Sequence, residues 1–252
     1  FQVDLAGRAA FLKWLPDGDA LEAEADGLTA LAATIRVPEV LDQGALAGGG
    51  ALLLEWLPLA SPGKQHWSAL GHALADLHAV RGARFGHHRD NWIGASPQYN
   101  APDTDWPRFF VEQRLVPQLR WARLGGLDAG IGQRVERVMA RVPDWLKGVA
   151  VGPALVHGDL WQGNVGALTG GRPVVFDPAV YYGHDEVDLA MLSLFGAVPE
   201  AFYRAYGKNP RDADFQHRAR LYNLYHLLNH FNLFGGGYAG AVSDSATALL
   251  RY

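Results

Sequence analysis

The sequence contains no cysteine in its 252 residues. Disulfide bonds, thiolate metal sites, iron–sulfur clusters and cysteine nucleophiles are therefore excluded together. Long apolar runs are also missing: the longest are short, as in Gly50–Leu54, and none could span a bilayer. Because we find neither a secretory signal nor a lipidation motif, we expect a cytoplasmic protein without a membrane partner.

Positive charge is scarce as well. The 22 Lys and Arg residues are outnumbered by 26 Asp and Glu, which gives a net charge of −4, so no basic field is available to attract nucleic acid. The basic residues include only four lysines: Lys13, Lys64, Lys147 and Lys208. With 49% hydrophobic and 19% charged residues, the chain is apolar enough to bury a sizeable core and too apolar to be disordered.

The first part of the chain predicts strands with one helix. We expect short strands over residues 1–5 and 9–15 joined by a turn at Ala6-Gly7, a helix over 19–33, and a buried strand over 51–57. The triple glycine at 48–50 precedes a strand and does not connect a strand to a helix. We therefore favour a hairpin turn there over a phosphate-binding loop.

After Pro58 the pattern becomes mainly helical. Helices are predicted over residues 66–80, 106–123, 131–146, 186–195, 199–206 and 213–234. Residues 91–105 are rich in Pro, Asn and Gly and predict a long loop, whereas residues 154–177 return to strand and turn. We therefore predict an α+β architecture with a small strand-rich lobe, residues 1–57, and a larger helical lobe, residues 58–252.

The segment Val156–Asn164, V-H-G-D-L-W-Q-G-N, carries the strongest chemical signal. A Gly-Gly turn at 170–171 and a β-branched strand that ends in Asp177 follow it, and the resulting hairpin would bring Asn164 close to Asp177. Phosphoryl transfer to a hydroxyl needs such a set: Asp159 would accept the hydroxyl proton, and an Asn oxygen and a second carboxylate would hold Mg²⁺ on the phosphates. An isolated loop Asp often only caps a turn, but the ordered set of three indicates a kinase-like phosphotransferase.

The N-terminal residues offer the remaining parts of such a site. Lys13 lies in an apolar strand, where a kinase needs a lysine for the α- and β-phosphates of ATP; the alternative is an outward edge charge. Glu22 and Glu24 on the following helix are candidates to hold this lysine, although acidic residues near a helix start also favour the helix dipole. Backbone groups for adenine would come from the junction of the lobes: Glu55, Trp56 and Leu57.

A glycine-rich phosphate loop is missing from the residues before Lys13. Nothing there fits G-x-G-x-x-G, and only Gly7 is available. If the protein uses such a loop, we expect it to precede Phe1.

Longer strings resemble the fructosamine/ketosamine-3-kinase family. They are H-G-D-L-W-Q-G-N at 157–164, F-D-P-A-V-Y-Y-G-H-D-E-V-D-L-A-M at 176–191, L-E-A-E-A-D-G-L at 21–28, and L-N-H-F-N-L-F-G-G-G-Y at 228–238. The resemblance runs from about Phe11 to the C-terminus. It implies the two-lobed protein-kinase-like fold that this family shares with aminoglycoside phosphotransferases, with a small antiparallel-sheet lobe that binds nucleotide and a helical lobe that carries a catalytic hairpin.

The resemblance also implies an activity: transfer of the γ-phosphate of ATP, with Mg²⁺, to the 3-hydroxyl of a ketosamine, which repairs glycated amines. Asp159 would be the catalytic base, Asn164 and Asp177 would bind Mg²⁺, and Lys13 would meet the phosphates, paired with Glu24 and not with Glu22. On the substrate side the resemblance places three residues: Trp161 against the sugar, with His230 and Asn229 nearby. The ketosamine would be a small molecule or a protein-bound adduct.

Three alternatives remain open from the residues. A kinase of the same fold could act on another small hydroxyl compound such as an aminoglycoside. A metal-dependent phosphohydrolase could use a set of ligand-type residues: His157, Asp159, Asp177, His184 and Asp185. A non-enzymatic nucleotide-binding module is the third, although a degenerate site usually loses one residue of the Asp159, Asn164 and Asp177 set.

Overall fold

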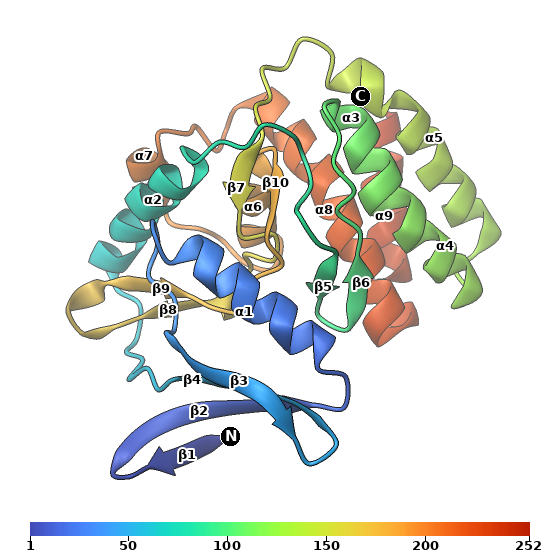
Figure 1. The fold of residues 1–252 in the computed structure, drawn as a ribbon. Helices are drawn as coiled ribbons and strands as arrows, with labels where there is room; N and C mark the ends of the chain where they lie inside the picture. Colours follow the sequence, from blue (N-terminus) through green and yellow to red (C-terminus); the bar gives the residue numbers. More distant parts are fainter.

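A four-stranded antiparallel sheet forms the N-terminal part of the computed structural model, which describes residues 1–252 (Figure 1). The strand order is β1-β2-β4-β3, where the bounds are β1 (Gln2–Leu5), β2 (Arg8–Leu15), β3 (Val40–Leu46) and β4 (Gly49–Glu55). The helix α1 (Asp19–Leu31) lies between this sheet and the rest of the molecule. Its buried face, which includes Leu21, Leu28 and Leu31, shares one apolar core with Leu52 and Leu54 of β4.

The two hairpins of the sheet confirm the predicted turns. Leu5 pairs with Arg8 around Ala6-Gly7. In the second hairpin only the first of the three glycines is in the turn, because Gly49 and Gly50 already belong to β4. A Cβ on Gly50 would lie 2.4 Å from the Cα of Gly18, so only glycine fits this close backbone contact. The partner strand β3 was not predicted as a strand: Asp, Gln and Gly interrupt it, and as an exposed edge it needs little apolar side chain.

Helices make up most of the remainder. Their bounds are α2 (Lys64–His78), α3 (Trp106–Phe109), α4 (Val116–Leu124), α5 (Ala129–Trp145), α6 (Glu186–Leu192), α7 (Glu200–Tyr206), α8 (Ala213–Phe234) and α9 (Ala239–Leu250). A π-helical turn, η1 (Phe110–Leu115), joins α3 to α4 within the predicted helix over 106–123. The helix α9, which packs against α5 and α8, was missed because it follows three glycines and is rich in small residues. None of the helices has both the length and the apolar character required for a membrane span.

Short strands complete the second lobe. They form three pairs: β5 (Asn91–Ile93) with β6 (Ser96–Gln98), β7 (Ala154–Val156) with β10 (Tyr181–Gly183), and β8 (Val165–Ala167) with β9 (Pro173–Val175). The β8–β9 hairpin is the predicted one, with Val165 opposite Val175. The long loop expected over 91–105 is wrong in part, because it contains the β5–β6 hairpin. Three single 3₁₀ turns lie at η2 (Gln162–Asn164), η3 (Thr169–Gly171) and η4 (Gly236–Tyr238).

Two apolar cores hold these elements together in a two-lobed α+β fold. One lies among η1, α4, α5, α8 and α9 in the C-terminal half. The other contains Leu28 and Leu54 from the N-terminal residues together with Leu70 and Leu74 of α2 and Leu189 of α6. The boundary at residue 57 is thus a boundary of secondary-structure type, and one core continues across it.

Candidate active site

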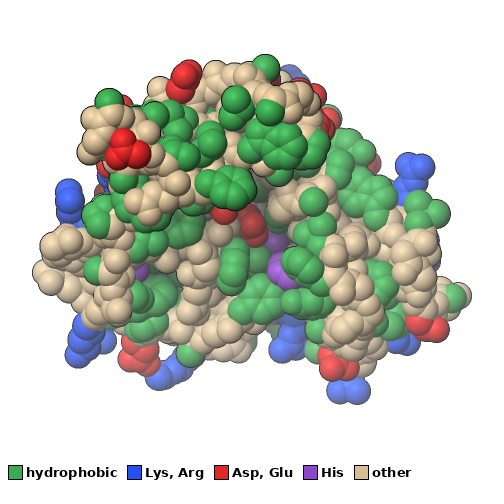
Figure 2. Space-filling view, turned by 90° about the horizontal axis from the view of Figure 1, so that it is seen from below, with side chains coloured by type: hydrophobic (Ala, Val, Ile, Leu, Met, Phe, Trp, Pro, Cys, Tyr) green, Lys and Arg blue, Asp and Glu red, His purple; other side chains and the backbone are tan.

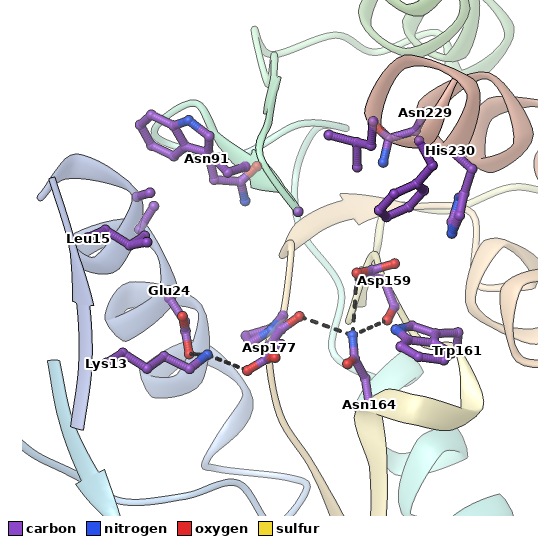
Figure 3. Close-up of a pocket in the computed structure, with 17 residues that line it drawn as sticks. Lys13, Leu15, Glu24, Asn91, Asp159, Trp161, Asn164, Asp177, Asn229 and His230 are labelled. Carbon is purple, nitrogen blue, oxygen red and sulfur yellow. Dashed lines mark hydrogen bonds and ion pairs between the residues drawn. The ribbon is translucent and has the colours of Figure 1, made fainter. Parts of the chain in front are cut away.

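A cavity of about 350 Å³ opens between α1, the loop at 157–164 and the end of α8. Acidic side chains and a histidine are visible in the hollow on this face of the molecule (Figure 2). Eight of the residues singled out in the sequence line this cavity: Lys13, Glu24, Asp159, Trp161, Asn164, Asp177, Asn229 and His230 (Figure 3). Side chains up to 217 residues apart in the chain therefore face one space.

Asp159 is the carboxylate with the most altered acidity. Burial, followed by the negative charges of Asp177 and Asp188, raises its pKa to about 7. Its Oδ2 accepts a hydrogen bond from Asn164 Nδ2 at 3.3 Å, which lowers the pKa only in part. A carboxylate without a cationic partner and with a pKa near neutrality is suited to accept a proton from a hydroxyl.

Asn164 and Asp177 lie on opposite sides of the β8–β9 hairpin, at the points where it meets the cavity (Figure 3). The Asn164 amide nitrogen donates to the backbone oxygen of Asp159 at 2.9 Å and to that of Asp177 at 3.5 Å. No protein group donates to Asn164 Oδ1 or to Asp177 Oδ2, so both oxygens are free, and oxygen donors of these two types fit Mg²⁺. Asp177 has a φ of 57°, a left-handed conformation that an ordered site holds at some cost in strain.

Lys13 bridges the two lobes. Its Nζ donates to Glu24 Oε1 at 2.6 Å and to Asp177 Oδ1 at 2.5 Å (Figure 3). Burial lowers the pKa of Lys13, but the charges of Glu24 and Asp177 outweigh it and the net pKa is raised, so the lysine is a cation. Glu22 is exposed on another face of α1 and lies 4.0 Å from Arg89. The structure thus brings Glu24, and not Glu22, to the lysine.

Asp188, a fully buried residue of α6, supports the loop that carries Asp159. Its carboxylate accepts the backbone N–H groups of His157 at 2.7 Å and Gly158 at 2.9 Å, and it is 3.1 Å from His78 Nε2. Burial raises the pKa of Asp188, but these hydrogen bonds and the nearby histidines lower it more, so the net pKa is lowered. The sequence alone does not identify Asp188 as an anchor, because a buried anchor and a surface carboxylate look alike in a single sequence.

His157 completes this support. Its Nε2 lies 3.1 Å from the carbonyl of Phe176, and its Nδ1 accepts the N–H of Asp159 at 3.3 Å. Burial lowers the pKa of His157, which agrees with a neutral imidazole that donates from Nε2 and accepts at Nδ1. With both ring nitrogens engaged by backbone groups, His157 has no nitrogen left to ligate a metal, which counts against the phosphohydrolase hypothesis.

A second cavity of about 560 Å³ adjoins the first at Lys13 and Asp177. Its walls include Phe11, Leu54 and the segment Glu55–Leu57. The backbone groups of Trp56 and Leu57 make no hydrogen bond within the protein, whereas the Glu55 carboxylate is turned toward Arg36 at 2.5 Å. An apolar slot with free N–H and C=O groups fits a flat, nitrogen-rich ring.

Aromatic side chains line the first cavity as well, and they include Trp161 and Phe234. Trp161 is 40% exposed, and its ring meets Phe195 edge-on at 6.3 Å between centroids. A Cβ on Gly163 would lie 2.1 Å from the Trp161 ring, so this glycine lets the indole lie flat over the loop. His230 Nδ1 is hydrogen-bonded to the carbonyl of His226 at 2.8 Å, which leaves Nε2 without a protein partner. Asn229, in contrast, is buried and hydrogen-bonded to Gln118 at 3.1 Å.

Comparison with known proteins shows that the chain matches one family. The family model for fructosamine kinase matches residues 6–252. A protein from Synechocystis sp., named as a probable ketoamine kinase, is 50% identical over 234 residues, which cover 91% of this chain and 78% of that protein. A crystal structure titled as a putative fructosamine-3-kinase from Thermobifida fusca superposes with a TM-score of 0.88 at 37% identity, over 100% of this chain and 89% of the other.

The fold extends to more distant enzymes. An aminoglycoside phosphotransferase, solved in a complex with AMP-PNP and hygromycin B, matches 99% of this chain and 88% of its own with a TM-score of 0.72. Its sequence identity is 17%, so the likeness is one of fold.

Proposed function

The chain belongs to the fructosamine kinase family, and we propose that it transfers the γ-phosphate of ATP to the 3-hydroxyl of a ketosamine. The observation that carries the proposal is the position of Asp159: its free carboxylate oxygen faces the cavity beside the Asn164 and Asp177 oxygens, and its pKa is raised to about 7. A base of that strength takes a hydroxyl proton near neutral pH as the bond to phosphorus forms.

The nucleotide would occupy the cavity that Glu55, Trp56 and Leu57 border, with its adenine against the unpaired backbone groups of Trp56 and Leu57. Its phosphates would extend toward Lys13, which Glu24 keeps in place by the 2.6 Å ion pair. Asn164 Oδ1 and the Asp177 carboxylate would hold Mg²⁺. When bound, Mg²⁺ neutralises charge on the phosphate oxygens.

The acceptor would occupy the neighbouring cavity. Its sugar would pack on the Trp161 ring, and its 3-hydroxyl would donate to Asp159. His230 Nε2 is free to hydrogen-bond a sugar hydroxyl, and Asn229 lies behind it as a support of the wall. The exposed Trp161, Phe195 and Phe234 leave this side open, which accommodates an amine that is itself part of a larger molecule.

The test is ADP release with ATP, Mg²⁺ and a panel of fructosamines and ribulosamines, with the parent sugars and amines as controls. We expect release with the ketosamines alone, and its loss in Asp159→Asn. Release with an aminoglycoside but with no ketosamine would overturn the acceptor assignment, and measurable ATP binding without release for any acceptor would overturn the activity.

A further inference from the structure

A group of ligand-type side chains lies outside the two cavities. It consists of Asp26 on α1 and the adjacent His87 and His88, in the segment between α2 and β5, and one ligand atom of each lies within 4.8 Å of the others. His87 Nε2 is 2.9 Å from Asp26 Oδ2, and His88 Nε2 is 3.3 Å from Asp26 Oδ1. We propose that these three side chains bind a divalent transition-metal cation of the zinc type, which ties α1 to the segment that leads into β5.

The donor set suits such a cation. Two imidazole nitrogens and one carboxylate are ligands of Zn²⁺ and related metals, and Mg²⁺ or Ca²⁺ would prefer oxygen donors throughout. Ligands about 2.0–2.2 Å from a tetrahedral Zn²⁺ are roughly 3.3–3.5 Å from one another. The 2.9 and 3.3 Å separations from the two Asp26 oxygens are close to this spacing. One ligand atom from each of the three side chains lies within 4.8 Å of the others, so the side chains close around the ion by a modest adjustment.

The histidines are held in place before any ion arrives. The His87 side chain is only 7% exposed and its ring lies 4.2 Å from that of His88, which is 64% exposed and opens the group to solvent. The backbone is fixed as well: Gly86 exchanges two hydrogen bonds with Tyr182, and His87 N donates to Asn100 O at 3.1 Å.

The surrounding charges permit a cation. The arginine whose charge acts on His87 is Arg89, and its guanidinium lies 4.0 Å from the carboxylate of Glu22, one turn before Asp26 on α1. That carboxylate offsets part of the Arg89 charge, while Asp26 faces the histidines. The group does not include a residue of the proposed catalytic site, so this inference is independent of the proposed function.

The proposed metal site lies close in the chain to residues of the first cavity. Asp26 is two residues from Glu24 on the same helix, and the His87-His88 segment continues into Asn91, which lines the first cavity. The helix α1 packs against β5 (Figure 1). A cation bound by Asp26, His87 and His88 would add a link between α1 and the segment that leads into β5.

The experiment is a calorimetric titration of the nucleotide-free protein with Zn²⁺ alone. It is run on a background of Asp177→Asn as well as on the unmodified chain, so that zinc at the catalytic oxygens is recognised. We expect one zinc ion per chain, with affinity at least tenfold weaker in His88→Ala and in Asp26→Asn. His72, an exposed histidine of α2, provides the matched control, and His72→Ala should bind as the unmodified chain does.

A second readout guards against a variant that fails to fold. Zinc should raise the melting temperature of the unmodified chain and of His72→Ala, and raise it much less in His88→Ala, whose fold is checked by circular dichroism. Equal affinity in all variants, or no binding to the unmodified chain, would overturn the proposal and leave the group as a hydrogen-bonded contact between α1 and the 87–88 segment.

Discussion

The loop at 157–164 and the Lys13 ion-pair group (Lys13, Glu24 and Asp177) face the same cavity but are built in different ways. The loop is held in shape by one fully buried carboxylate, Asp188, which accepts hydrogen bonds from two of the loop's backbone N–H groups. The ion-pair group consists of side chains that are 14–51% exposed and joins residues 164 positions apart in the chain.

This contrast separates two tasks. Asp159 is positioned by a buried network within one lobe. Burial, together with the charges of Asp177 and Asp188 and with no cation beside it, raises its pKa, which suits a base. Asp177 is positioned across the lobes and has a cation 2.5 Å away, which suits a metal ligand. Under the proposed function the two carboxylates would differ in role because their surroundings differ.

Removing the base should give the largest effect. Asp159→Asn keeps the volume of the side chain but cannot accept a proton, so we expect kcat to fall by about 10²–10⁴-fold with ATP binding little changed. Steady-state kinetics and a nucleotide-binding titration measure the two quantities. Asp144→Asn, an exposed site on α5, is the matched control. A variant with normal turnover would remove the distinction between the two carboxylates.

Removing the anchor of the loop should affect folding. Asp188→Ala leaves two buried N–H groups and His78 without their partner, and breaking such a buried network costs about 3–5 kcal/mol in the free energy of unfolding. Because the pKa of Asp188 is lowered in the folded protein, its contribution is present above the unfolded pKa of about 3.9 and is lost as the pH falls through the folded value. Urea unfolding should therefore show a large difference from the unmodified chain at pH 7 and a smaller one near pH 3; a constant difference would contradict the assignment.

Removing the cation of the ion-pair group should weaken nucleotide use more than folding. Lys13→Ala loses charge-assisted hydrogen bonds worth about 1.5–3 kcal/mol, so we expect kcat/KM for ATP to fall by about 10–100-fold. Lys147→Ala, at an exposed position after α5, should leave kcat/KM unchanged. If Lys13→Ala lowered stability as much as Asp188→Ala, the proposed division between the two regions would fail.

The smallest effect tests the coupling between the regions. Burial is the main cause of the raised pKa of Asp159, and the charge of Asp177 adds to it. Asp177→Asn removes that charge, so the pKa of Asp159 in the nucleotide-free protein should move down from about 7. Carbon-13 NMR titration of the carboxyl groups measures this pKa, with Asp144→Asn again as the control. An unchanged pKa would show that the charge of Asp177 does not contribute to it.

Much of this arrangement could be predicted from the sequence, because local patterns encode it. The spacing of Asp159, Asn164 and Asp177 around a Gly-Gly turn predicted a hairpin, and the structure contains it. The two lobes and most helices follow from the apolar periodicity. The choice of Glu24 over Glu22 came from the resemblance, and the structure places Glu24 at Lys13.

The parts that were missed depend on distant partners. Strand β10 has three residues and is defined by its pairing with β7, so its own sequence does not predict a strand. The helix α9 is made of small residues that become helical by packing on α5 and α8. The role of Asp188 exists only because the fold buries it beneath residues 157 and 158.

The apolar core that continues across residue 57 bears on how the chain folds. Leu28 and Leu54 pack in one cluster with Leu70, Leu74 and Leu189. Neither the part before residue 57 nor the part after it can therefore complete this core alone. A fragment cut at the junction would expose that apolar surface to water, and we expect it to aggregate instead of folding as an independent domain. Melting of the intact chain should accordingly be one cooperative event for both lobes, because residues 1–57 have no separate fold of their own.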